Sequence, residues 1–66
     1  MGKTYLNKLK PGSRFNLHGL QGILLSVGIN AEVLITEIPN DIWHQENESY
    51  YKGRHTWSAK TLVEEL

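Results

Sequence analysis

The stretch 22–38 constrains the fold of this 66-residue chain more than any other. It reads Gly-Ile-Leu-Leu-Ser-Val-Gly, then Ile-Asn, then Ala-Glu-Val-Leu-Ile-Thr-Glu-Ile, and no other stretch is so apolar. β-Branched side chains suit a pleated, half-buried surface. Gly28 and Asn30 tolerate the positive φ of a tight turn. We therefore predict a central β-hairpin with strands over 22–28 and 31–38.

Both predicted strands of this hairpin carry apolar side chains on both faces. Alternation places Ile23, Leu25 and Val27 on one face of the first strand. In the second strand, Leu34 lies opposite to Val33. The pattern leaves open which face is buried, because a strongly curved small barrel can bury parts of both.

The segments before the hairpin predict a further strand and two turns. Pro11-Gly12-Ser13 is a turn signal. The alternation of polar and apolar residues over 14–18 predicts a strand with Phe15 and Leu17 on one face. The glycine-bounded segment 19–22 predicts a second turn. Residues 1–10 fit either one helical turn or a short strand.

The segments after the hairpin predict a loop followed by short strands. The polar segment 43–48 predicts a loop with a mobile tip at 45–49. We expect strands at 49–52 and 54–57, then a turn at 58–60 and a last strand over 61–66. A C-terminal helix, capped by Ser58 or by a Thr61–Glu64 capping box, is the alternative.

Many short strands and glycine turns in so short a chain predict a single all-β domain over residues 1–66, a small barrel of five or six strands. The run Tyr50-Tyr51-Lys52-Gly53-Arg54, then Trp57 and Leu62-Val63-Glu64-Glu65-Leu66, resembles the C-terminal half of Src-homology-3-like barrels, with a short turn before the last strand. The resemblance implies that Val63 is a core residue and that Tyr50 takes the place of a groove-lining Trp. The family's ligand-contacting Pro and Tyr correspond to Ala59 and Leu62.

The glycine spacing of the N-terminal half is similar to that of KOW-type barrels. The segments that carry this similarity are 11–15, 19–24 and 33–35. That family binds nucleic acid and proteins associated with ribosomes or polymerases, so the similarity implies a nucleic-acid-binding barrel as an alternative function.

The composition excludes several classes of protein. There is no cysteine, so disulfides and thiolate zinc sites are excluded. The longest aliphatic run, Ile23-Leu24-Leu25, is too short to span a membrane, and we expect a cytoplasmic protein. The net charge is zero, but bases and acids come in separate blocks along the chain. Charge in blocks can give a folded domain one basic and one acidic side.

No motif indicates catalysis or a cofactor. Asp41 is the only Asp, and the three histidines lie far apart in sequence. Asp41, His44 and Glu46 or Glu48 offer possible metal ligands, but one histidine among carboxylates is a weak zinc pattern and a surface histidine explains it better. We therefore expect no enzyme, no metal site and no cofactor.

The aromatic residues of the last third point to binding instead. Rings beside basic groups suit the capture of a peptide or stacking on bases. We expect Trp57 in the core, Trp43 partly exposed and Tyr50 at the surface. The residues predicted to bind a partner protein are Trp43, Tyr50, Lys52, Arg54 and His55. The alternative nucleic-acid site consists of Lys8, Lys10, Arg14, Tyr50, Lys52 and Arg54.

The first hypothesis is therefore a small protein–protein interaction module, an adaptor or inhibitor. The second is a nucleic-acid-binding barrel, and the third is a small enzyme subunit that is active only as an oligomer. A homodimer is compatible with all three, because a chain this small often completes its core by self-association. In size the chain resembles the accessory proteins of bacteria and their phages.

Overall fold

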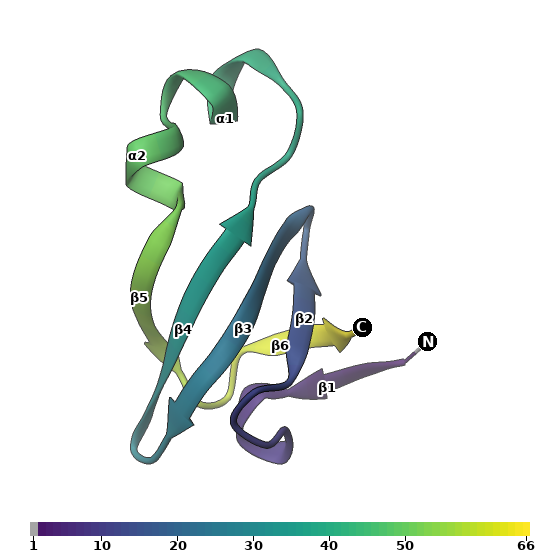
Figure 1. Ribbon diagram of the computed structural model, residues 1–66. Helices are drawn as coiled ribbons and strands as arrows, with labels where there is room; N and C mark the ends of the chain where they lie inside the picture. Colours follow the sequence, from purple (N-terminus) through teal and green to yellow (C-terminus); the bar gives the residue numbers. More distant parts are fainter. Residues whose placement is uncertain (1) are drawn as a thin grey trace.

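The computed structural model describes residues 2–66 as a single curled antiparallel sheet of six strands (Figure 1). The elements are β1 (Lys3–Tyr5), the 3₁₀ helix η1 (Leu6–Lys8), β2 (Arg14–Leu17), β3 (Leu20–Val27), β4 (Asn30–Glu37), α1 (Ile42–Glu46), α2 (Glu48–Tyr51), β5 (Gly53–Ser58) and β6 (Leu62–Glu65). The all-β prediction is confirmed. No helix over 2–66 is long and apolar enough to cross a membrane.

The strand order is β1-β6-β2-β3-β4-β5, so β1 and β5 are the two edges of the sheet. Neighbouring strands pair antiparallel throughout this order. No ladder joins β1 to β5 in the described chain, so the hydrogen-bonded sheet remains open between its edges. The structure therefore shows a curled sheet, and the closed barrel stays a prediction.

The predicted central hairpin is present as β3 and β4, and the structure decides which face is buried. Leu24 and Val33 pair directly and are fully buried. The register shifts between Leu24 and Ser26, which leaves Leu25 at a bulge. A bulge adds one residue and reverses the alternation. Val27 therefore lies on the same side as Leu24 and packs against the core, although a regular strand would place it opposite.

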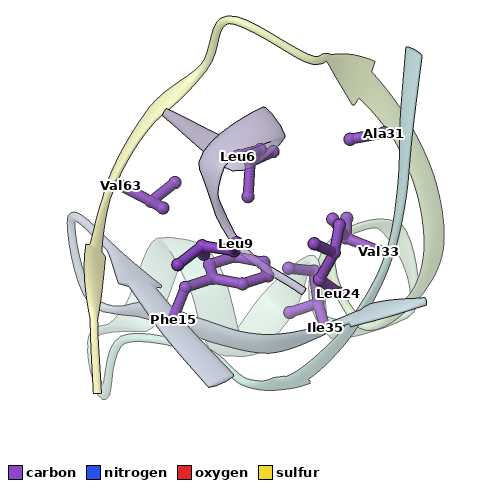
Figure 2. Close-up of a cluster of buried hydrophobic side chains, with 8 residues drawn as sticks. All are labelled: Leu6, Leu9, Phe15, Leu24, Ala31, Val33, Ile35 and Val63. Atoms are coloured by element: carbon purple, nitrogen blue, oxygen red, sulfur yellow. The ribbon is translucent and has the colours of Figure 1, made fainter. Parts of the chain in front are cut away.

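The core consists of eight buried apolar side chains that the curled sheet surrounds (Figure 2). They are Leu6, Leu9, Phe15, Leu24, Ala31, Val33, Ile35 and Val63. Val63 is buried, as the resemblance to Src-homology-3-like barrels implied. Burying such aliphatic and aromatic side chains stabilises a fold by about 1.5–3 kcal/mol each, and this cluster is the one core of the domain.

The first ten residues contain both of the elements that the sequence left open. β1 pairs with β6, and η1 then turns inward so that Leu6 is fully buried. The Leu6 N–H donates to the Thr61 carbonyl and the Asn7 N–H to the Ala59 carbonyl, each at 3.0 Å. These two hydrogen bonds fix η1 against the turn between β5 and β6. η1 thereby covers one end of the core, which we call the closed end.

The tight turns differ in place from the prediction. β2 and β3 are joined by His18 and Gly19, which have φ of 51° and 90°. Positive φ at both central residues is what a two-residue type I′ hairpin turn requires, and histidine tolerates it better than most residues. The prediction of a turn over 19–22 is therefore wrong by about two residues. The expected positive φ at Gly28 and Asn30 does not occur.

The segment 43–52 differs most from its predicted secondary structure. The predicted loop is the pair of short helices α1 and α2, and the predicted strand at 49–52 is α2 with the residue that ends it. Tyr50 therefore stands on a helix, where the resemblance implied a strand. The strand predicted at 54–57 is confirmed as β5, and the C-terminal strand as β6. The alternative C-terminal helix is wrong.

The absence of a side chain at Gly22 lets the backbone of β3 pass close to the backbone of β4 at Leu34. A Cβ at this buried position would lie 2.6 Å from the Leu34 carbonyl oxygen and 3.1 Å from a Phe15 ring carbon. We expect Gly22→Ala to lower the free energy of unfolding by about 1–3 kcal/mol, because the backbone has to move to relieve the overlap. Urea denaturation followed by tryptophan fluorescence measures the change.

Gly28→Ala is the matched control for this substitution. A Cβ at Gly28 would have no heavy atom within 4 Å, and Gly28 does not have a positive φ. The free energy of unfolding of Gly28→Ala should lie within about 0.5 kcal/mol of the wild-type value. Equal effects of the two substitutions would contradict the role assigned to Gly22.

Candidate functional site

Helix α1 begins at Asp41, whose two carboxylate oxygens both accept hydrogen bonds from His44. The backbone N–H of His44 donates to Oδ1 at 2.9 Å, and the His44 ring donates from Nδ1 to Oδ2 at 2.7 Å. Asp at the N-cap satisfies one of the free N–H groups of the first turn. These hydrogen bonds lower the pKa of Asp41 below its ordinary value of 3.8, the backbone bond contributing most.

Asn47 lies at the junction of the two helices, and one ion pair spans α2. The Asn47 side-chain amide donates to the Trp43 carbonyl at 2.7 Å, where α1 ends. In the next turn, Lys52 Nζ lies 2.8 Å from a Glu48 carboxylate oxygen. The hydrogen bond to Glu48 raises the pKa of Lys52 above 10.5. Such local bonds allow helices of five and four residues to persist, which intrinsic propensity alone does not.

The aromatic rings of the two helices gather around Tyr51. The Trp43 indole N–H donates to the Tyr51 hydroxyl at 3.2 Å. The His44 ring centroid lies 4.7 Å from that of Tyr51, and the Tyr50 ring meets Tyr51 edge-on at 5.1 Å. Edge and tilted contacts of this kind stabilise aromatic pairs beyond their buried area. The contacts of Trp43 and His44 with Tyr51 fix the orientation of α1 relative to α2.

This arrangement leaves three large hydrophobic side chains in solvent. Ile42 is 77% exposed, Trp43 65% and Tyr50 72%. We call these three residues the helix face. Figure 1 shows α1 and α2 projecting beyond the end of the β4–β5 hairpin, so the helix face lies away from the closed end of the core.

A pocket of about 310 Å³ adjoins the helix face on the concave side of the sheet. Its lining comes from four separate parts of the chain and consists of Leu17, Leu20, Ile35, Tyr50, Tyr51, His55 and Trp57. The volume is at the lower end of the range for ligand pockets and is large enough for one bulky side chain. We call it the aromatic pocket.

The walls of the aromatic pocket are held in place by contacts with the core and with α2. The His55 ring donates from Nε2 to the Tyr51 carbonyl at 2.8 Å. Trp57 meets the buried Phe15 ring edge-on with centroids 5.7 Å apart. Trp57 is half-buried at the rim of the core rather than fully inside it. The pocket is thus a preformed depression rather than a gap between loose side chains.

The structure brings together part of the predicted protein-binding set. Tyr50 and His55 both line the aromatic pocket, and Trp43 is linked to them through Tyr51. Lys52 follows α2, and Arg54 is exposed on β5 with its guanidinium 3.6 Å from Glu32. The five predicted residues therefore lie between α1 and the first half of β5.

The predicted nucleic-acid set is spread over separate parts of the molecule. Lys8 ends η1 at the closed end of the core. Arg14 begins β2, and pairing places it in one row with Ile23, Leu34 and Arg54 across four strands. Two half-buried aliphatic side chains thus separate the two arginines. Tyr50 lines the concave side, so it does not share a face with Arg14.

A metal site is not formed by the candidate ligands. Asp41 and His44 are occupied with each other in the helix cap. Across residues 2–66, no three His, Asp or Glu side chains gather as metal ligands.

Several residues of the site could not be found from the sequence. Leu17 and Leu20 line the pocket from the β2–β3 turn, more than thirty positions from Tyr51. The sequence pattern marks Asp41 as the end of a strand and as a candidate for catalysis or a metal, and an Asp immediately before Ile42-Trp43 is also an N-cap signal. That signal could have predicted α1.

No family model, no curated protein and no solved structure matches this chain.

The cap at Asp41 predicts a pH dependence of stability. Because the folded-state pKa of Asp41 lies below 3.8, its contribution is present above pH 3.8 and is lost as the pH falls through the lowered value. Asp41→Asn keeps a capping oxygen but removes the charge. We expect wild type to be the more stable at pH 6 and the difference in urea midpoint to shrink as the pH falls below 3.8. A difference that stays constant over this range would contradict the assignment.

Proposed function

We propose that this domain is a non-enzymatic protein-binding module that uses the helix face and the aromatic pocket beside it. The observation that carries the proposal is the exposure of Ile42, Trp43 and Tyr50 together on two short helices. The three residues lie within nine positions on the two short helices, and large exposed apolar side chains that gather in one region mark interaction sites. Trp and Tyr are also the residue types that contribute most to binding at protein interfaces.

The position of the helix face supports the same proposal. The helices add no residue to the buried core. Nevertheless side-chain bonds at Asp41 and Asn47 hold α1, an ion pair stabilises α2, and Tyr51 contacts two side chains of α1. A preorganised apolar surface loses less conformational entropy when a partner binds.

Charge favours a protein partner over nucleic acid as the first candidate. Binding to the phosphate backbone requires several cations on one surface. Here only Lys52 and Arg54 of the predicted set lie near the helix face, whereas Lys8 ends η1 and Arg14 begins β2. The nucleic-acid function therefore remains the alternative, and the experiment below includes it.

Selection from a random peptide display library tests the proposed function. We expect selected peptides to bind wild type and to lose at least about tenfold in affinity for the double variant Trp43→Ala with Tyr50→Ala. Because both side chains contact Tyr51 but lie outside the core, the free energy of unfolding should fall by about 1–2 kcal/mol while the fold is retained. Isothermal titration calorimetry gives the affinity, and urea denaturation gives the stability.

Ile29→Ala is the matched control, because Ile29 is 96% exposed in the turn between β3 and β4, at the opposite end of that hairpin from α1. It should leave the affinity unchanged. Equal affinity of wild type and the double variant would overturn the proposal. Salt-sensitive binding of short DNA or RNA duplexes, without selection of any peptide, would favour the nucleic-acid alternative instead.

A further inference from the structure

The two edges of the sheet differ in a way that singles out β5. Edge strands expose unpaired backbone groups that can pair with another chain, and natural proteins shorten or interrupt them. β1 has only three residues. β5 has six, pairs with β4 without a register shift and contains no proline. Over the described residues, no strand pairs with the outer side of β5.

The side chains of β5 alternate between the aromatic pocket and solvent. Gly53, His55 and Trp57 are half-buried, and the last two line the pocket. Arg54 and Thr56 are exposed on the opposite face. A strand added beside β5 would follow the same alternation, because paired residues in a sheet point to the same side. Every second side chain of that strand would then point toward the pocket side, and its neighbours would lie beside Arg54.

The bases along this edge outnumber the acids that reach it. The segment 49–63 carries Lys52, Arg54 and Lys60 and contains no Asp or Glu. The acids that reach it, Glu48 and Glu32, come from outside the segment, and both ion pairs are solvent-exposed. Exposed pairs contribute little and exchange readily with other partners. The edge therefore suits an acidic occupant and disfavours a second copy of β5, which would bring like charges together.

We propose that β5 accepts an extended acidic segment of a partner protein as an added strand, with one aliphatic or aromatic side chain of that segment in the aromatic pocket. This inference rests on the proposed function and specifies the conformation and charge of the ligand. Backbone hydrogen bonds to the edge provide affinity, whereas the pocket and Arg54 select the sequence. The helix face then forms the border of the site at the Gly53 end of β5.

A synthetic peptide, acetyl-Thr-Glu-Leu-Glu-Leu-Glu-Thr-amide, is the probe for this proposal. Its leucines and glutamates alternate, so that the leucines can face the pocket while the glutamates face Arg54. Titration is followed by ¹⁵N chemical shifts and by amide hydrogen exchange at low ionic strength, where charge attraction is strongest. We expect alternate amides of β5 to become protected from exchange, while those of β1 stay unchanged.

Modified peptides separate strand addition from other ways of binding. N-methylation of the alternate residues whose N–H groups face β5 should abolish binding, whereas methylation of the other set should change the affinity by less than about threefold. Replacing the glutamates with lysines should weaken binding by at least about tenfold. Equal effects of the two methylation patterns would overturn the proposal.

Charge reversal on the protein gives a matched pair of variants. Arg54→Glu should weaken binding of the acidic probe by at least about tenfold and improve binding of the lysine peptide. Lys10→Glu makes the same change of charge in the exposed link between η1 and β2 and should have little effect. Equal loss in both variants would indicate attraction by net charge only and would overturn the assignment to β5.

The outcomes also distinguish this inference from the proposed function. If display-selected peptides bind the helix face while the acidic probe protects no β5 amide, strand addition is wrong and the binding function stands. If the display yields no binding peptide and the acidic probe does not bind, both the proposed binding function and strand addition at β5 are wrong. Protection of β5 amides without peptide, together with a dimer in sedimentation equilibrium, would show that a second copy occupies the edge and would overturn the proposal.

Discussion

The fold depends on enclosing one apolar core with a single short sheet. Without disulfides, 66 residues have to gain their stability from the burial of eight side chains around Phe15 and Leu24. The sheet can curl tightly because Gly22 has no Cβ where β3 passes the Leu34 carbonyl. The bulge at Leu25 then returns Val27 to the concave side. η1 covers the end of the core that the strands leave open.

The two helices that carry the helix face lie outside this core. All eight core residues lie outside the segment 39–52, so the two helices contribute nothing to the central packing. Their arrangement depends instead on local bonds at Asp41, Asn47 and Tyr51. A surface built in this way can change its sequence at a small cost in stability. The helix face therefore uses no core residue, whereas the aromatic pocket shares Ile35 with the core.

The sequence predicted those elements that local patterns mark. Alternation predicts the strand at Phe15, dense apolar and β-branched side chains predict the β3–β4 hairpin, and turn signals beside short segments predict the strands at Trp57 and Val63. The segment 43–52 could not be predicted in this way, because its polar residues are used in caps and ion pairs rather than in an apolar face. Trp43 and Tyr50 were expected at the surface and are exposed, but on helices instead of on a loop and a strand.

The sequence by itself determined an all-β domain, its central hairpin and the gathering of aromatic and basic residues in the last third of the chain. These features are local, since they depend on neighbours within a few positions. Only the tertiary structure decided which face of the hairpin is buried, that Leu17 and Leu20 meet Tyr51 and His55 in a pocket, and that β5 is an edge. Strand order and the curl of the sheet decide these contacts, because they bring together residues that no local pattern relates.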